Sequence, residues 1–173
     1  MFGAIGRHHI NKGFDIFLKA LADPRLRDYE WRAVIAGDGP ETANLRQLTS
    51  DYQLNDRVNF LGWIDDVNSF YKTIDVFVLP SREEPFGLVL LEAIAEGVPI
   101  VATNTDGPLD ILRNRSMGLM VERENAAALT QIIIEIIEEK YDLTSLSEQA
   151  FREISTAFSF ETIATCLHKA LTK

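Results

Sequence analysis

The fold is decided by residues 75–102, which read DVFVLPSREEPFGLVLLEAIAEGVPIVA. The uninterrupted apolar run Val76–Leu79 is typical of a strand that is covered on both faces. Residues 88–96 carry a helical apolar pattern, and Gly97 fits the glycine that follows a helix C-terminus. A second apolar run, residues 99–102, comes next. The stretch therefore predicts a strand, a helix and a second strand.

The same alternation extends to both sides of this stretch. Further strands are expected at residues 2–5, 31–36, 58–61 and 119–121. Helices are expected at residues 11–21 with Asn11 as cap, from Pro40 to about 52, at 67–74, and from 125 onward with breaks near Asp142 and Ser159, where Ser159 caps a last helix to Leu171. Strands that alternate with helices favour parallel pairing with right-handed crossovers. The sequence therefore predicts an α/β fold: a doubly wound, Rossmann-like parallel sheet of about six strands with helices on both faces.

Length and composition narrow the class of protein. The 173 residues suit one domain, and 46% hydrophobic with 25% charged residues exclude a disordered chain. The formal charge of −9 disfavours binding to nucleic acid or to an anionic membrane face. The single cysteine, Cys166, is expected in the core, and no apolar run approaches the roughly 20 residues of a membrane span. No signal peptide is visible, so we expect a cytoplasmic protein. We expect residues 1–173 to form a single domain.

Ligands of such sheets bind at the carboxyl ends of the strands, so functional residues are expected in the loops that follow strands. Residues 6–13, GRHHINKG, follow the first strand and open a helix, and Arg7 and Lys12 add two cations there. A helix N-terminus with two cations fits a phosphate site, and a solvated basic loop is the alternative. The residues match neither the dinucleotide fingerprint nor the P-loop. His8 and His9 lack a third clustered ligand, so no metal site is expected.

Three further loops carry unusual residues. Gly37-Asp38-Gly39-Pro40 allows a ligand to approach the backbone, or is simply a turn that Asp38 caps. Glu84 lies in the third loop, residues 80–88. Glu92 lies on an otherwise apolar helix, where it needs a buried partner. Sugar hydroxyls are good donors to a carboxylate. The backbone amides of residues 86–88 form a second candidate anion site. Residues 103–108 are expected to be a polar turn-forming loop.

Taken in order, these motifs resemble the C-terminal, nucleotide-sugar-binding domain of GT-B fold glycosyltransferases of the retaining family 4, also called group 1. The matching segments span most of residues 3–121 and are Gly6-Arg7, Lys12-Gly13, residues 35–41, 57–62, 75–81, 84–88, 91–93 and 97–102. Glu84 and Glu92 match the E-x7-E pair of that family. Each segment is weak alone, and the ordered set is specific.

The resemblance implies a role for each matching position. Arg7, Lys12 and Glu84 are the implied catalytic residues: the two cations bind the donor diphosphate, and Glu84 contacts the donor sugar. The implied donor- and nucleotide-binding residues are Gly6, Gly37, Gly39, Trp63, Phe86, Gly87, Leu88 and Glu92. In this set Glu92 binds the ribose, the two glycines leave room for the nucleotide, and Trp63 either stacks on the base or is buried.

Two departures from the family pattern matter. The family often has Gly-Gly and then Glu after the fifth strand, whereas this chain has Asp106-Gly107-Pro108 and later Asp110. The acceptor-binding N-terminal domain, which usually supplies a histidine, is absent from this chain, and neither His8 nor His9 is expected to replace it. The implied partners are that domain and a UDP-, GDP- or ADP-sugar, with no metal cofactor and with peripheral membrane association open to the full-length enzyme.

The leading hypothesis is the donor-binding half of a retaining glycosyltransferase of bacterial envelope polysaccharide or lipopolysaccharide synthesis, inactive on its own. A stand-alone nucleotide-sugar binding or regulatory module is one alternative, because one lobe cannot close a water-excluding cleft. A sugar-nucleotide epimerase of the same fold is another, but it lacks the E-x7-E pair. An NAD-dependent Rossmann domain fails on the missing fingerprint.

Overall fold

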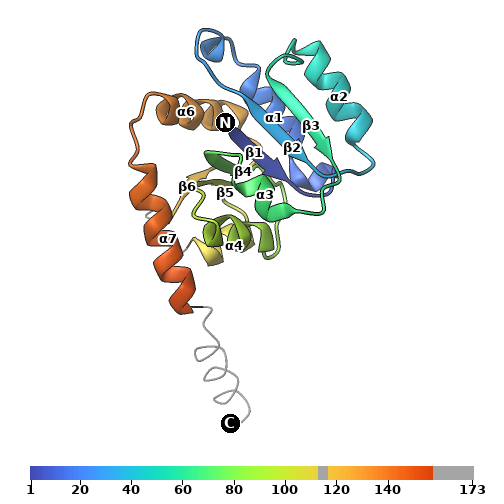
Figure 1. The fold of residues 1–173 in the computed structure, drawn as a ribbon. Helices are drawn as coiled ribbons and strands as arrows, with labels where there is room; N and C mark the ends of the chain where they lie inside the picture. Colours follow the sequence, from blue (N-terminus) through green and yellow to red (C-terminus); the bar gives the residue numbers. More distant parts are fainter. Residues whose placement is uncertain (113–116, 158–173) are drawn as a thin grey trace.

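The computed structural model describes residues 1–112 and 117–157, and its centre is a six-stranded sheet (Figure 1). The strands are β1 (Phe2–Ile5), β2 (Ala33–Ala36), β3 (Val58–Gly62), β4 (Val76–Leu79), β5 (Ile100–Thr103) and β6 (Leu119–Val121). Their order is β3-β2-β1-β4-β5-β6, and every neighbouring pair is parallel. The predicted fold class is confirmed.

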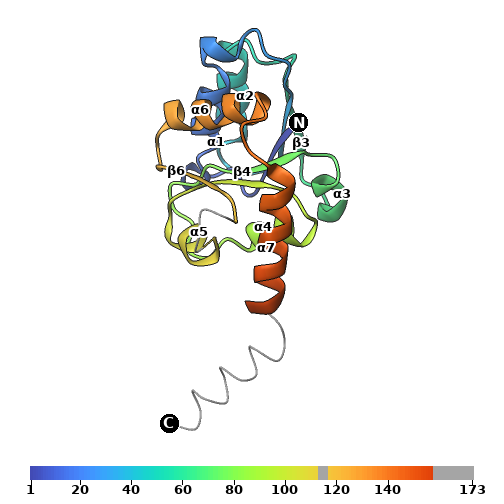
Figure 2. The ribbon, with the colours of Figure 1, turned by 90° about the vertical axis from the view of Figure 1, so that its left-hand side faces the viewer.

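Helices cover both faces of the sheet, as Figures 1 and 2 show. The helices are α1 (Phe14–Leu21), α2 (Thr42–Asp51), α3 (Val67–Tyr71), α4 (Leu88–Ala95), α5 (Asp106–Ile111), α6 (Ala126–Ile137) and α7 (Leu143–Ala157), with short 3-10 turns η1 (Ile10–Lys12) and η2 (Pro24–Leu26). No helix in the described part of the chain is both long and apolar enough to cross a membrane.

Strand β4 shows why its sequence has no polar interruption. Val76 and Val78 pack into the core on the side of α1 and α6, whereas Phe77 and Leu79 pack into the core on the side of α4. Successive strand residues point to opposite faces, so a strand with a helix layer on each side is apolar throughout. Burial of both faces fixes β4 in the middle of the molecule.

Three local predictions were wrong. Asn11 does not cap a long helix: residues 10–12 form η1, and Gly13, with φ of 64°, precedes α1. Pro40 is not the first helical residue, because α2 begins at Thr42. Residues 106–111, expected in part as a loop, form α5, where Pro108 is tolerated in the first turn because its missing N–H has no helical acceptor there.

Two other local predictions were confirmed, and others concern residues outside the described part of the chain. Gly97 follows the end of α4 with φ of 73°, and the predicted break at Asp142 separates α6 from α7. Trp31 precedes β2, which is shorter than expected, and its indole donates to the carbonyl of Leu26. The predictions for Cys166 and for a final helix from Ser159 lie outside the described residues.

Candidate functional site

The strand order reverses direction between β1 and β4, which makes this pair the switch point of the sheet. The chain leaves β1 toward α1 on one face of the sheet and leaves β4 toward α4 on the other face. Loops that diverge in this way open a space at the carboxyl ends of the two strands, where ligands of α/β sheets bind. The two loops, residues 6–13 and 80–87, carry most of the residues that the sequence pointed to.

The two loops bring Lys12 and Glu84 into direct contact. The Lys12 ammonium lies 2.6 Å from the Glu84 carboxylate, and the side chains are 28% and 8% exposed. The Ser81 hydroxyl lies 3.5 Å from the same carboxylate oxygen. A carboxylate this buried is stabilised by a cation, and the cation keeps an exposed part that can meet a ligand. Two of the three predicted catalytic residues therefore form one charged pair.

A second set of contacts fixes the position of that pair. The backbone N–H groups of Arg82 and Glu83 both donate to the carbonyl of Asn11, and the Asn11 amide donates to the Glu83 carboxylate at 2.7 Å. These bonds hold Asn11 against Arg82 and Glu83, the residues next to Lys12 and Glu84. Sequence reasoning missed Asn11 in this role, because its partner lies 72 residues away along the chain.

Arg82 extends the same clamp to α1. Its guanidinium makes two hydrogen bonds of 2.7 Å to Asp15 and one of 2.8 Å to the carbonyl of Ile10. Burial favours the neutral acid, but the hydrogen bonds and charge of Arg82 outweigh it and lower the pKa of Asp15. The bidentate pair thus locks the first loop and the start of α1 onto the third loop.

Glycines allow the loops to approach each other closely. A Cβ on Gly37, where φ is 113°, would lie 2.0 Å from the carbonyl oxygen of Gly6. A Cβ on Gly39 would lie 2.5 Å from the carbonyl oxygen of His8. Packing of the second loop on the first already requires both glycines. Their expected role in leaving room for a nucleotide stays a prediction, as does nucleotide contact by Gly6.

Glu92 has the buried partner that its place on an apolar helix predicts. Its side chain is exposed, and its partner is Tyr71, whose hydroxyl lies 3.2 Å from the carboxylate and 3.0 Å from the carbonyl of Val89. Burial and the adjacent Glu92 charge raise the pKa of Tyr71, so the hydroxyl stays protonated and can donate. The Glu92 carboxylate itself is exposed because α4 buries Leu90, Ala93 and Ile94, and position 92 faces away from that core.

The N-terminus of α4 lies at the same edge of the sheet. Gly87 precedes the helix with φ of 90°, and the Phe86 and Leu88 side chains beside it are 48% and 64% exposed. The first N–H groups of a helix have no acceptor within it, so they are available to an anion. Trp63, in the loop after β3, is 78% exposed, which decides against a buried indole.

The first loop, residues 6–13, contains one exposed and one buried side chain side by side. Arg7 is exposed and makes no ion pair with another described residue. His8 is fully buried between Phe14 and Phe60, and its Nδ1 lies 2.8 Å from the Thr42 hydroxyl oxygen. No group of three metal-binding side chains occurs within residues 1–112 and 117–157.

His8 gives the fold a pH dependence. The Thr42 hydroxyl donates to Asp38, so Thr42 accepts from His8 Nδ1, and His8 Nε2 has no partner in the described structure. Burial lowers the pKa of His8 despite the nearby Asp38 charge. The Ala36 carbonyl also favours the charged imidazole, and burial outweighs that contact as well.

We expect the free energy of unfolding to fall as the pH drops below about 6.5, because the unfolded chain then binds a proton that the folded His8 resists. His8→Asn keeps a donor near Thr42 without titrating, so urea unfolding at several pH values should show a flatter dependence. The exposed neighbour His9→Asn is the matched control. Equal slopes for His8→Asn and the wild type would contradict the assignment.

The chain is similar in sequence to lipopolysaccharide core enzymes. It is 37% identical over 161 residues to the lipopolysaccharide core biosynthesis glycosyltransferase LpsE of Rhizobium meliloti, covering 92% of this chain and 46% of that protein. It is 30% identical over 172 residues to the lipopolysaccharide core biosynthesis mannosyltransferase LpcC of Rhizobium leguminosarum, covering 96% and 49%. The chain thus spans about half the length of these relatives.

Solved structures show the same fold, that of GT-B glycosyltransferases. The structure of Anabaena Alr3699/HepE in complex with UDP superposes with a TM-score of 0.86 at 27% identity, over 99% of this chain and 48% of that one. The C-terminal domain of the group 1 family glycosyl transferase LpcC from Francisella tularensis gives 0.80 at 26% identity, over 92% and 86%. The family model described as glycosyl transferases group 1 matches residues 1–153, so this chain belongs to the group 1 glycosyltransferase family.

Proposed function

We propose that the chain is the donor-binding domain of a retaining glycosyltransferase that uses a nucleoside-diphosphate sugar in bacterial envelope polysaccharide or lipopolysaccharide synthesis. The observation that carries the proposal is the Lys12–Glu84 pair between the β1 and β4 loops, next to the exposed Arg7 and the N-terminus of α4. Two cations and a helix N-terminus are the groups that bind a diphosphate. The relatives named for lipopolysaccharide core synthesis support the pathway class.

The arrangement can stabilise the leaving group directly. When the bond between sugar and diphosphate breaks, negative charge grows on the phosphate oxygens, and Arg7 and Lys12 are placed to meet it. Glu84, held by Lys12, directs a carboxylate toward the sugar hydroxyls, and Glu92 offers a second carboxylate to the ribose. In this proposal the two cations provide the positive charge that a divalent metal provides in other transferases.

The acceptor is proposed to bind to a second, N-terminal domain, because the matched relatives are about twice as long as this chain. One lobe cannot exclude water from both sides of the reacting bond. We therefore expect the isolated chain, as a cytoplasmic protein, to bind the donor at the β1 and β4 loops without transferring its sugar. Binding, rather than turnover, is therefore the direct test.

A comparison of UDP, GDP and ADP tests the proposal, with Trp63 fluorescence as the readout. We expect one nucleotide to bind preferentially, and Glu92→Ala to weaken it about tenfold through the lost charge-assisted bond to the ribose. Trp31, the other tryptophan, is buried and should not respond. Glu96→Ala, at the far end of α4, is the matched control. Failure of all three nucleotides to bind would contradict the proposal.

A further inference from the structure

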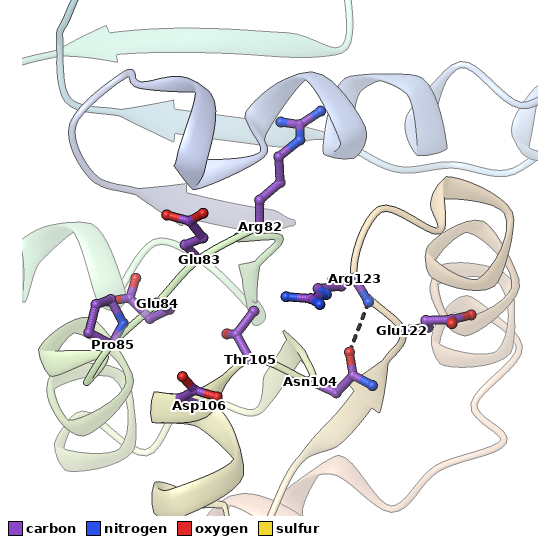
Figure 3. Close-up of a pocket in the computed structure, with 9 residues that line it drawn as sticks. All are labelled: Arg82, Glu83, Glu84, Pro85, Asn104, Thr105, Asp106, Glu122 and Arg123. Atoms are coloured by element: carbon purple, nitrogen blue, oxygen red, sulfur yellow. Dashed lines mark hydrogen bonds between the residues drawn. The ribbon is translucent and has the colours of Figure 1, made fainter.

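A polar pocket lies on the other side of Glu84 from the β1 loop. It has a volume of about 550 Å³ and is formed by the loops after β4, β5 and β6 (Figure 3). Its lining residues are Arg82, Glu83, Glu84, Pro85, Asn104, Thr105, Asp106, Glu122 and Arg123. That size falls in the range of small-molecule sites, roughly 300–1,000 Å³. The role proposed above uses only Glu84 of these residues.

Thr105 is the most unusual residue of the pocket. It is 5% exposed, and its hydroxyl has no hydrogen-bond partner in the described structure. It precedes α5, yet its side chain does not cap the helix, as a threonine in that position commonly does. A buried hydroxyl without a partner costs free energy, so rotation of the Thr105 side chain toward a ligand atom that satisfied it would favour binding.

Arg123 supplies the matching donors. Its backbone N–H donates to the Asn104 side chain at 2.9 Å, which fixes the start of the side chain at the end of β6. Figure 3 shows the guanidinium extending from there across the pocket toward Thr105. The exposed guanidinium makes no salt bridge within the described residues, unlike Arg82, which turns away to Asp15 and Glu124.

The remaining groups are acceptors. Glu83 uses one carboxylate oxygen for Asn11 and keeps the other, and the Asp106 carboxylate lies beside Thr105 in Figure 3. Four acidic residues line the pocket, and of its two arginines only Arg123 extends the guanidinium across it, so the lining is unfavourable for an anion. The lining is too polar for an apolar ligand, and the described residues include no metal-binding cluster. Donors and acceptors side by side match hydroxyl groups, each of which does both.

We propose that this pocket binds an uncharged sugar unit, separate from the sugar that the nucleotide carries. Arg123 donates to its hydroxyls, Asp106 and Glu83 accept from them, and Thr105 gains its missing partner. The inference rests on the proposed function only for the class of ligand. The shared wall at Glu84 places this second sugar next to the reacting one.

The test is an NMR titration of the full chain with neutral methyl hexosides. We expect amide shifts at residues 104–106 and 122–123, and about tenfold weaker binding for Arg123→Ala. Arg152→Ala, an exposed arginine on α7, should match the wild type. Thr105→Val should weaken sugar binding while leaving the melting temperature unchanged or raised, because it removes an unpaired hydroxyl. A purely structural threonine would lower the melting temperature instead.

Three outcomes would overturn the inference: no shifts at these residues, tighter binding there of glucuronate or glucose 6-phosphate than of neutral glycosides, or displacement of the glycoside by the nucleotide sugar selected above. A UDP, GDP and ADP titration in the same samples separates the two proposals. Nucleotide shifts at residues 6–13 without glycoside shifts refute the second sugar alone. Glycoside shifts without any nucleotide binding refute the proposed function alone.

Discussion

Replacing Lys12 by methionine will weaken binding of a nucleoside diphosphate about tenfold to a hundredfold, because a charge-assisted bond to phosphate is lost. Methionine keeps an unbranched side chain and removes only the charge. Titration calorimetry with the preferred nucleotide measures the loss. An affinity equal to that of the wild type would remove Lys12 from the proposed diphosphate site.

The same substitution leaves the buried Glu84 carboxylate without its cation. We expect a loss of about 1–3 kcal/mol in the free energy of unfolding, smaller than for a fully buried pair because Lys12 is 28% exposed. The double variant Lys12→Met/Glu84→Gln removes both charges and should recover most of this stability. It should not recover nucleotide binding, and recovery of binding would show that the first effect was one of folding.

Gly13→Ala will destabilise the fold by about 3–4 kcal/mol, because left-handed backbone strain and a clash with backbone atoms add. Gly13 has φ of 64°, and its new Cβ would lie 2.0 Å from the carbonyl oxygen of Pro80. The neighbour is backbone at the end of β4, so it cannot rotate away as a side chain could. Relief of the clash requires the loops after β1 and β4 to separate.

Gly97→Ala is the matched control for this prediction. Its φ of 73° imposes a similar left-handed strain, but no atom lies within 4 Å of the new Cβ. Its cost should therefore be only the backbone term, about 1–2 kcal/mol. Urea unfolding of both variants separates strain from collision. Equal losses for the two would show that the loops can part without cost.

The fold could be predicted from the sequence because its signals are local. The apolar runs of the six strands and the glycine after α4 depend only on near neighbours, and all six strands were placed within a few residues. Segments with conflicting signals were misjudged. Residues 103–108 are polar and contain Gly107 and Pro108, so they suggested a turn, whereas packing against Phe86 allows α5 to begin there.

The contacts between the predicted site residues could not be read from the sequence. Lys12 and Glu84 were each singled out, but their pairing depends on the strand order, which places the first loop beside the third. Arg82, Asp15 and Tyr71 were missed, because their partners are recognisable only after the chain has folded. Roles for Arg7, Gly6 and Trp63 in ligand binding remain predictions.

The place of β1 between β2 and β4 has a consequence for how the molecule is assembled in time. β1 pairs with β4, which begins about 70 residues later, so the loops after these strands cannot meet until about half of this chain has found its place. Parallel pairings between distant segments are slow to form. A nucleotide bound across both loops would stabilise them together, so it would slow hydrogen exchange in residues 6–13 and 80–87 alike rather than in one loop.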